Sequence, residues 1–189
     1  MRVLTATLIA FSSADPAVSG TPPIYPTDMM NQSEYVGYWS DTPAWKVYEY
    51  RANGEGFCTV YSAPYATPIG SYQVAVTFGS INEFALVTSA PVQGANEGAI
   101  DFDQSGGFDW YDIVPHEIQK PHEDQLTYWY GNTMTSGMVQ KLIAVMKHDR
   151  TATITFAGRK FPISLTGFVA AYGDMKRCEN HRVGRVLED

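Results

Sequence analysis

Short apolar segments recur along the middle of the chain, separated by Gly, Pro and Asn residues that favour turns. In residues 72–78 the alternation is strict, so that every second side chain, from Tyr72 to Phe78, lies on one face of a half-buried strand. This pattern indicates an antiparallel β domain. The predicted strands are residues 45–51, 57–62, 72–78, 83–89, 98–102, 108–114, 125–130, 151–156 and 160–165.

Two segments near the C-terminus show the period of an amphipathic helix instead. The first follows a candidate N-cap at residues 135–137, and the second follows Thr166. We therefore predict a mainly β fold, an antiparallel β-sandwich or open barrel with two packed helices near the C-terminus. The apolar stripes are Met138, Leu142, Val145 and Met146 in the first helix, and Phe168, Ala171, Tyr172, Met175 and Cys178 in the second.

Composition divides the chain into four parts. A chain of 189 residues is long enough for one domain with a sizeable core. Residues 15–42 are rich in Pro, Gly, Ser and Thr and are predicted to form an extended, poorly ordered leader. We assign residues 1–14 to a signal peptide, 43–180 to a single β-rich domain and 181–189 to a solvated tail.

The N-terminus has the three parts of a secretory signal. Arg2 precedes an apolar run over residues 3–11, and the small residues 12–14 follow it. We predict cleavage after Ala14 and a periplasmic or secreted protein. The alternative is a buried N-terminal strand. No stretch reaches the roughly 20 apolar residues that a transmembrane helix needs.

The two cysteines, Cys58 and Cys178, lie far apart and lack the C-x-x-C spacing of metal or redox motifs. In the oxidising compartment that the signal predicts, a disulfide between them is the favoured interpretation. Two separate buried thiols are the alternative.

Acidic residues dominate the charge of the chain. The net charge is −7, from 13 Lys and Arg against 20 Asp and Glu. Such an excess repels phosphate backbones and anionic lipids unless basic residues are segregated. The densest basic stretch, residues 176–185, is interrupted by acids. We predict no nucleic-acid partner.

Residues 101–112 have the spacing of a calcium-binding loop. Oxygen-bearing side chains stand at loop positions one, three, five, nine and twelve, and Gly106 at position six permits a sharp turn. The favoured interpretation is a β-hairpin, with strands at 98–102 and 108–114 and a turn at 104–107. The candidate calcium ligands are Asp101, Asp103, Ser105, Asp109 and Asp112.

Residues 116–124 contain two of the four histidines beside three acids, and we expect an exposed acidic loop there. His116 and His122 lack the helical-turn spacing of a zinc protease. The chain contains no G-x-S-x-G, G-x-x-x-x-G-K-[ST] or G-x-G-x-x-G motif. We therefore predict no enzymatic activity. The alternative is a metal-dependent hydrolase that uses Asp101, Asp103, His116 and His122.

Three consecutive aromatic residues mark a candidate binding surface. In a strand, Tyr128 and Tyr130 lie on one face and Trp129 on the other, so we expect at least one aromatic side to be uncovered. The predicted partner is a protein or a component of the cell envelope.

Several motifs together resemble small periplasmic proteins of alphaproteobacteria. They are a tryptophan in an early strand, the cysteine-containing GFCTVY at residues 56–61, FPISLTGF at residues 161–168, and a closing cysteine. The stretch 141–172 is similar to the C-terminal part of the invasion-associated locus B family. This resemblance covers about a third of the chain and implies a secreted β-sandwich-like domain without an established catalytic centre. We therefore predict a non-catalytic binding or envelope-accessory domain.

Overall fold

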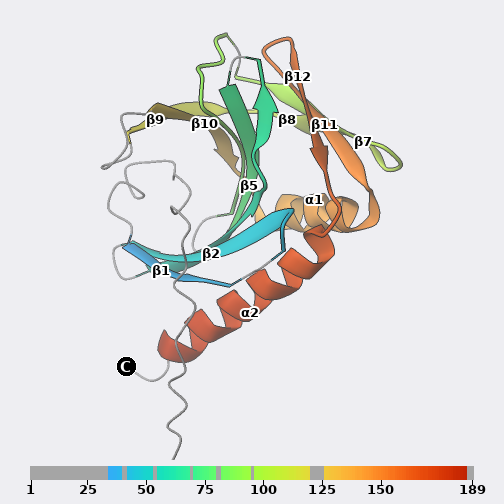
Figure 1. Cartoon of the computed structure of the whole chain (residues 1–189). Helices are drawn as coiled ribbons and strands as arrows, with labels where there is room; N and C mark the ends of the chain where they lie inside the picture. The colour runs from blue at the N-terminus through green and yellow to red at the C-terminus, as the bar shows by residue number, and fades with distance from the viewer. Residues whose placement is uncertain are drawn as a thin grey trace, which may run out of the picture.

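The structure, a computed structural model, describes residues 34–39, 42–52, 55–68, 70–79, 82–94, 96–119 and 126–186. Within these residues the chain forms two open antiparallel sheets and two helices near the C-terminus, which confirms the predicted fold class (Figure 1). The predicted signal peptide lies outside the described residues, as does most of the predicted leader.

The larger sheet has eight strands and the smaller sheet four. The larger sheet contains β1 (Glu34–Tyr38), β2 (Trp45–Ala52), β3 (Glu55–Ser62), β4 (Tyr65–Thr67), β5 (Gly70–Gly79), β6 (Glu83–Thr88), β9 (Val114–Gln119) and β10 (Leu126–Thr133). The smaller sheet contains β7 (Gly98–Phe102), β8 (Gly106–Trp110), β11 (Thr151–Phe156) and β12 (Arg159–Ser164). The strand orders are β1-β2-β3-β5-β6-β10-β9, with β4 paired to β5, and β12-β11-β7-β8.

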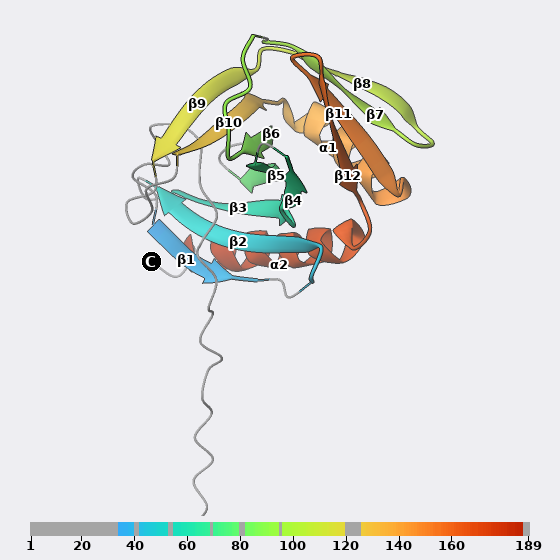
Figure 2. The same ribbon diagram turned by 45° about the horizontal axis from the view of Figure 1, so that its top comes forward.

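The larger sheet curls, so that strands distant within it face one another. In Figure 2, β2 and β3 lie on one side, β9 and β10 lie on the other, and β5 and β6 join them. Tyr61 on β3 contacts Trp129 on β10, with 6.4 Å between the ring centroids. In a flat sheet, three strand spacings would separate these strands by about 14 Å.

Small residues permit this curl. Ala75, Ala85 and Gly131 are register partners across β5, β6 and β10, and Ala75 also pairs with Tyr61. Because this row carries methyl groups or no side chain, the large rings on either side have room to approach each other. We call the buried set on this concave face the inner-face cluster; it comprises Tyr48, Tyr50, Phe57, Tyr61, Ala75, Ala85, Val87 and Trp129.

The outer face of the larger sheet belongs to the main core. Val47, Val60, Val74 and Val76 alternate with the inner-face residues and pack with both helices and the smaller sheet. Figure 2 shows α2 (Phe168–Val186) along β2 and β3, and α1 (Ser136–His148) on the side of the smaller sheet. Both faces of the central strands are therefore covered, which explains why every residue of β6 is buried.

Two tyrosine hydroxyls join the sheets at the edge strand β12. The Tyr65 hydroxyl accepts a hydrogen bond from the Ser164 backbone N–H at 2.8 Å, and the Tyr72 hydroxyl donates to the Pro162 carbonyl. The Tyr65 and Tyr72 rings stack with their centroids 5.1 Å apart. These contacts satisfy backbone groups on the side of β12 that does not pair with β11.

Helix α1 begins at the predicted cap, where the Thr135 hydroxyl accepts a hydrogen bond from the Met138 N–H. Its buried face differs from the prediction, because Met138 is exposed and Val145 is only partly buried. Val139 and Ile143 are buried in their place, so the buried face is displaced around the helix relative to the prediction. The buried residues of α1 are Val139, Leu142, Ile143 and Met146.

Helix α2 buries the predicted stripe, with Tyr172 half-buried at its margin. It continues to Val186, so residues 181–186 of the predicted tail are helical. Among the described residues, neither helix combines the length and the apolar character needed to cross a membrane.

Three strands differ from the sequence prediction. Residues 34–38 form β1 although they belong to the predicted leader, and Tyr65–Thr67 forms the short β4. Val114–Gln119 forms β9, so the N-terminal half of the predicted acidic loop is an edge strand, while residues 120–125 lie outside the described residues. Pro115 suits an edge strand because it cannot donate to a second neighbour.

The predicted disulfide between Cys58 and Cys178 is confirmed, with the Cα atoms 6.3 Å apart. It attaches the middle of α2 to β3, and both cysteines are fully buried. The bond closes a loop of 120 residues. In the chain-entropy model, such a loop is worth about 4–5 kcal/mol of stability.

We expect the double substitution C58A/C178A to lower the free energy of unfolding by about 4 kcal/mol, because it releases this constraint on the unfolded chain. Urea denaturation of the oxidised full-length protein measures the change. Wild-type protein reduced with a thiol reagent is the control and should lose a similar amount. Unchanged stability in both samples would show that the bond does not brace the fold.

Candidate functional site

The predicted calcium loop is a β-hairpin. Phe102 pairs with Gly106, which leaves 103–105 as a three-residue turn. Gly106 has φ +84°, the left-handed conformation that closes such a turn. The hairpin prediction is confirmed, with its turn at residues 103–105 in place of the predicted 104–107. Among the residues that the structure describes, no group of three His, Cys, Asp or Glu is arranged to hold a metal ion.

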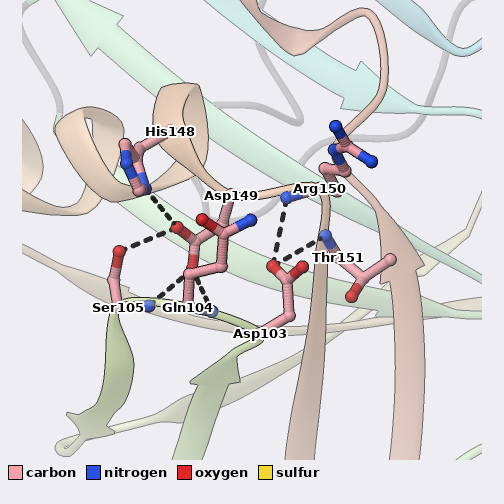
Figure 3. Close-up of polar contacts among 7 residues, drawn as sticks. All are labelled: Asp103, Gln104, Ser105, His148, Asp149, Arg150 and Thr151. Carbon is pink, nitrogen blue, oxygen red and sulfur yellow. Dashed lines mark hydrogen bonds and ion pairs between the residues drawn. The ribbon is translucent and has the colours of Figure 1, made fainter.

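Asp103 fastens this turn to the start of β11. Its Oδ1 accepts hydrogen bonds from the backbone N–H groups of Arg150 at 3.1 Å and Thr151 at 3.2 Å (Figure 3). The Asp103 carboxylate therefore binds backbone donors and has a structural role. The side chains of Asp101, Asp109 and Asp112, the other predicted carboxylate ligands, are exposed.

Asp149, at the C-terminal end of α1, binds the same hairpin turn. Its Oδ2 accepts from the backbone N–H groups of Gln104 at 3.1 Å and Ser105 at 2.9 Å. The Ser105 hydroxyl and His148 Nδ1 both lie 2.8 Å from Oδ1 (Figure 3). Burial opposes ionisation, but the hydrogen bonds from His148, Ser105 and Gln104 outweigh it and hold the pKa of Asp149 well below its usual range.

These contacts define a structural clasp, formed by Asp103 and Asp149, between the hairpin turn and the α1–β11 connection. The Ser105 hydroxyl bonds to the carboxylate and not to the imidazole, so the serine is not paired with a histidine base. Sequence reasoning missed Asp149. A signal exists, because a carboxylate at the C-terminal cap of a helix is disfavoured by the helix dipole and needs compensating donors.

The four residues of the hydrolase alternative are not brought together by the described part of the chain. Asp101 and Asp103 belong to the β7–β8 hairpin of the smaller sheet. His116 belongs to β9, at the edge of the larger sheet. His122 lies outside the described residues.

The aromatic triplet Tyr128, Trp129 and Tyr130 is not an exposed surface. Trp129 is fully buried, Tyr130 is buried and Tyr128 is partly buried. The predicted alternation is correct, since Trp129 joins the inner-face cluster while the two tyrosines pack with the main core. The prediction of an uncovered side is wrong, because the inner-face cluster covers one face of β10 and the main core covers the other.

Glu83 places a carboxyl group within the inner face. It lies on the same face of β6 as Ala85 and Val87 and is buried. The Trp129 indole N–H donates to Glu83 Oε1 at 3.1 Å. Its register partner Thr77 bonds to the Thr59 hydroxyl at 3.1 Å. Burial raises the pKa of Glu83 to about 7, although the hydrogen bond from Trp129 acts in the opposite direction.

The sequence pattern predicts a strand at Glu83 but no role for its carboxyl group. The signal was present, because the period of two puts Glu83 on the same face as Ala85 and Val87, in a segment that is otherwise apolar. A carboxyl group at such a position is either at an edge or buried with a shifted pKa. Deciding between these needs the sheet order, which the sequence pattern does not give.

Gly131 is required at the centre of this arrangement. A Cβ at this position would lie 2.5 Å from Trp129 Nε1 and would also clash with Glu83 Oε1. Glycine therefore leaves the space in which the Trp129–Glu83 hydrogen bond lies.

A rigid corner connects the two sheets between β8 and β9. The exposed fractions of Tyr111 and Val114 are 52% and 50%. Asn132 holds the corner, since its Nδ2 donates to the Tyr111 carbonyl at 2.6 Å and its Oδ1 accepts from Trp110 Nε1 at 2.9 Å. Asp112 adopts φ +54° between the two exposed side chains. The corner thus presents apolar side chains on a fixed backbone.

Acidic groups surround Tyr111. The hydrogen bond from its hydroxyl to Asp109, together with the charge of Asp109, raises the pKa of Tyr111, and the charge of Glu97 adds to this effect. The ring is therefore exposed within a negative environment.

Comparison of the chain with protein-family models, with curated proteins and with solved structures found no match.

We expect Gly131→Ala to lower the free energy of unfolding by about 1–3 kcal/mol, because the added methyl group overpacks the inner face. Gly137→Ala in α1 is the matched control, since a Cβ there meets nothing within 4 Å and alanine favours a helix by up to about 1 kcal/mol. Parallel thermal and urea denaturation compare the two variants. Equal effects of both substitutions would refute the close packing at Gly131.

Proposed function

We propose that this protein is a non-catalytic extracytoplasmic domain, periplasmic or secreted, that binds a protein of the cell envelope. The observation that carries the proposal is the Cys58–Cys178 bond. Structural disulfides form and persist in oxidising compartments and are rare in the cytosol. The apolar N-terminal run at residues 3–11, preceded by Arg2, supports the same compartment from the sequence.

The polar side chains of the clasp make structural hydrogen bonds, which supports a binding function over hydrolysis. Asp103 and Asp149 accept backbone hydrogen bonds within the clasp, and Ser105 donates to Asp149. These groups hold the fold together. We also propose a distant relationship to the invasion-associated locus B family, which rests on the motifs at residues 56–61 and 161–168.

The contact surface in this proposal is the corner that carries Tyr111 and Val114. A rigid backbone with exposed apolar side chains loses little conformational entropy on association. The acids beside Tyr111 favour a partner segment with a Lys or Arg side chain, which can lie over the ring and pair with Asp109. Such a contact combines an ion pair with Asp109 and burial of the Tyr111 ring.

The compartment is tested by expressing the full chain with a C-terminal tag in a Gram-negative host. We expect the protein in the extracytoplasmic fraction, with a mass that shows cleavage after Ala14 and no free thiols under denaturing, non-reducing conditions. The C58A/C178A variant is the control for thiol detection. Uncleaved protein in the cytosol with two free thiols would overturn the proposal.

The contact surface is tested by site-specific photo-crosslinking in cells of the native host. A photoreactive residue at position 111 should yield one dominant cross-linked envelope protein, and Asp109→Lys should weaken this product at least about tenfold through charge repulsion. Position 169 is the matched control, because Val169 is exposed to a similar degree, 55%, on α2. Equal products from both positions, or none from position 111, would exclude the corner as the binding surface.

A further inference from the structure

The contact between β3 and β10 lies next to the buried carboxyl group of Glu83. Tyr61 and Trp129 meet across the inner face, and Trp129 donates its indole N–H to Glu83. Gly131 lies beside this hydrogen bond, and a side chain at position 131 would clash with both of its partners. The aromatic contact and the carboxyl therefore form one packed unit.

The surroundings of Glu83 neutralise its charge poorly. From β5 it faces Thr77, from β10 Trp129 and Gly131, and from β3 Tyr61, whose hydroxyl lies close enough to feel its charge. Within the described part of the chain, no Lys, Arg or His forms an ion pair with Glu83. A buried carboxylate with one strong donor needs water or a cation to complete its hydrogen bonds.

We propose that Glu83 is the trigger of a proton-operated clamp: the neutral carboxyl lets Tyr61 and Trp129 close over the inner face, and its ionisation admits water and loosens that contact. The structural reason is the shortage of donors. The Trp129 ring both donates to the carboxylate and contacts the Tyr61 ring, so water that enters beside Glu83 disturbs the contact between the two rings. This inference is independent of the proposed function and concerns a different face of the molecule.

The direction of the pH effect follows from the raised pKa. Unfolding returns Glu83 to its ordinary pKa of 4.5, whereas burial raises it to about 7 in the folded chain. The stabilisation from the neutral carboxyl is complete below about pH 4.5 and is lost as the pH rises through about 7. The clamp is closed in mildly acidic solution and loosened in mildly alkaline solution.

The test is an NMR titration of the full-length protein labelled with ¹³C at glutamate carboxyls and ¹⁵N at tryptophan indoles. We expect the Glu83 carboxyl resonance and the Trp129 indole resonance to share a midpoint near pH 7. Between about pH 6 and pH 8, hydrogen exchange at the Trp129 indole should accelerate about tenfold beyond the intrinsic base catalysis. Wild-type protein alone is sufficient for this measurement.

Two variants separate Glu83 from other acids. Glu83→Gln, which keeps the shape and an acceptor for Trp129, should abolish the midpoint and the excess exchange of the indole. Glu97→Gln removes an exposed carboxyl and should leave both unchanged. A Glu83 midpoint below about pH 5 would overturn the proposal. A midpoint near 7 with no change in Trp129 exchange would overturn it equally, because the carboxyl would then titrate without moving the clamp.

Discussion

The structure depends on the burial of the larger sheet on both faces. An antiparallel sheet commonly leaves one face to solvent, but here the outer face packs with the helices and the smaller sheet while the inner face closes on itself. Closure requires curl, and the small row formed by Ala75, Ala85 and Gly131 leaves room for it. The contact between Tyr61 and Trp129 is the direct result.

The C-terminal segments hold this curled sheet in place by two separate means. The Cys58–Cys178 bond attaches α2 covalently to β3, so the helix cannot leave the outer face. The clasp of Asp103 and Asp149 fixes the smaller sheet to the end of α1 through charge-assisted hydrogen bonds to the backbone. Both devices join segments that are distant in sequence.

Local periodicity was sufficient to predict much of this fold. The alternation in residues 72–78 and the stripe from Phe168 to Cys178 identify their elements correctly, because in both cases one side of the element faces the main core. The hairpin at 98–110 follows from its glycines and from the poor helix formers around it. The disulfide followed from the predicted compartment and from the number of cysteines.

Features that depend on the order of strands were not predictable in the same way. Trp129 and Tyr130 are buried because the sheet curls over one face of β10 and the main core covers the other, and no pattern within residues 126–133 indicates this. The same holds for Glu83, whose raised pKa depends on β3 and β10 approaching across the curl. Strand β9 was missed because its sequence, with Pro115 followed by His116 and Glu117, is typical of a loop.

The central claim is that the larger sheet curls until β3 and β10 touch across the inner face. Nuclear Overhauser measurements on the full-length protein, with Tyr and Trp rings selectively labelled, test this claim directly. Ring centroids 6.4 Å apart predict clear cross-peaks between the Tyr61 and Trp129 ring protons at mildly acidic pH. Cross-peaks from each ring only to residues on adjacent strands, and none between the two rings, would contradict the curled sheet.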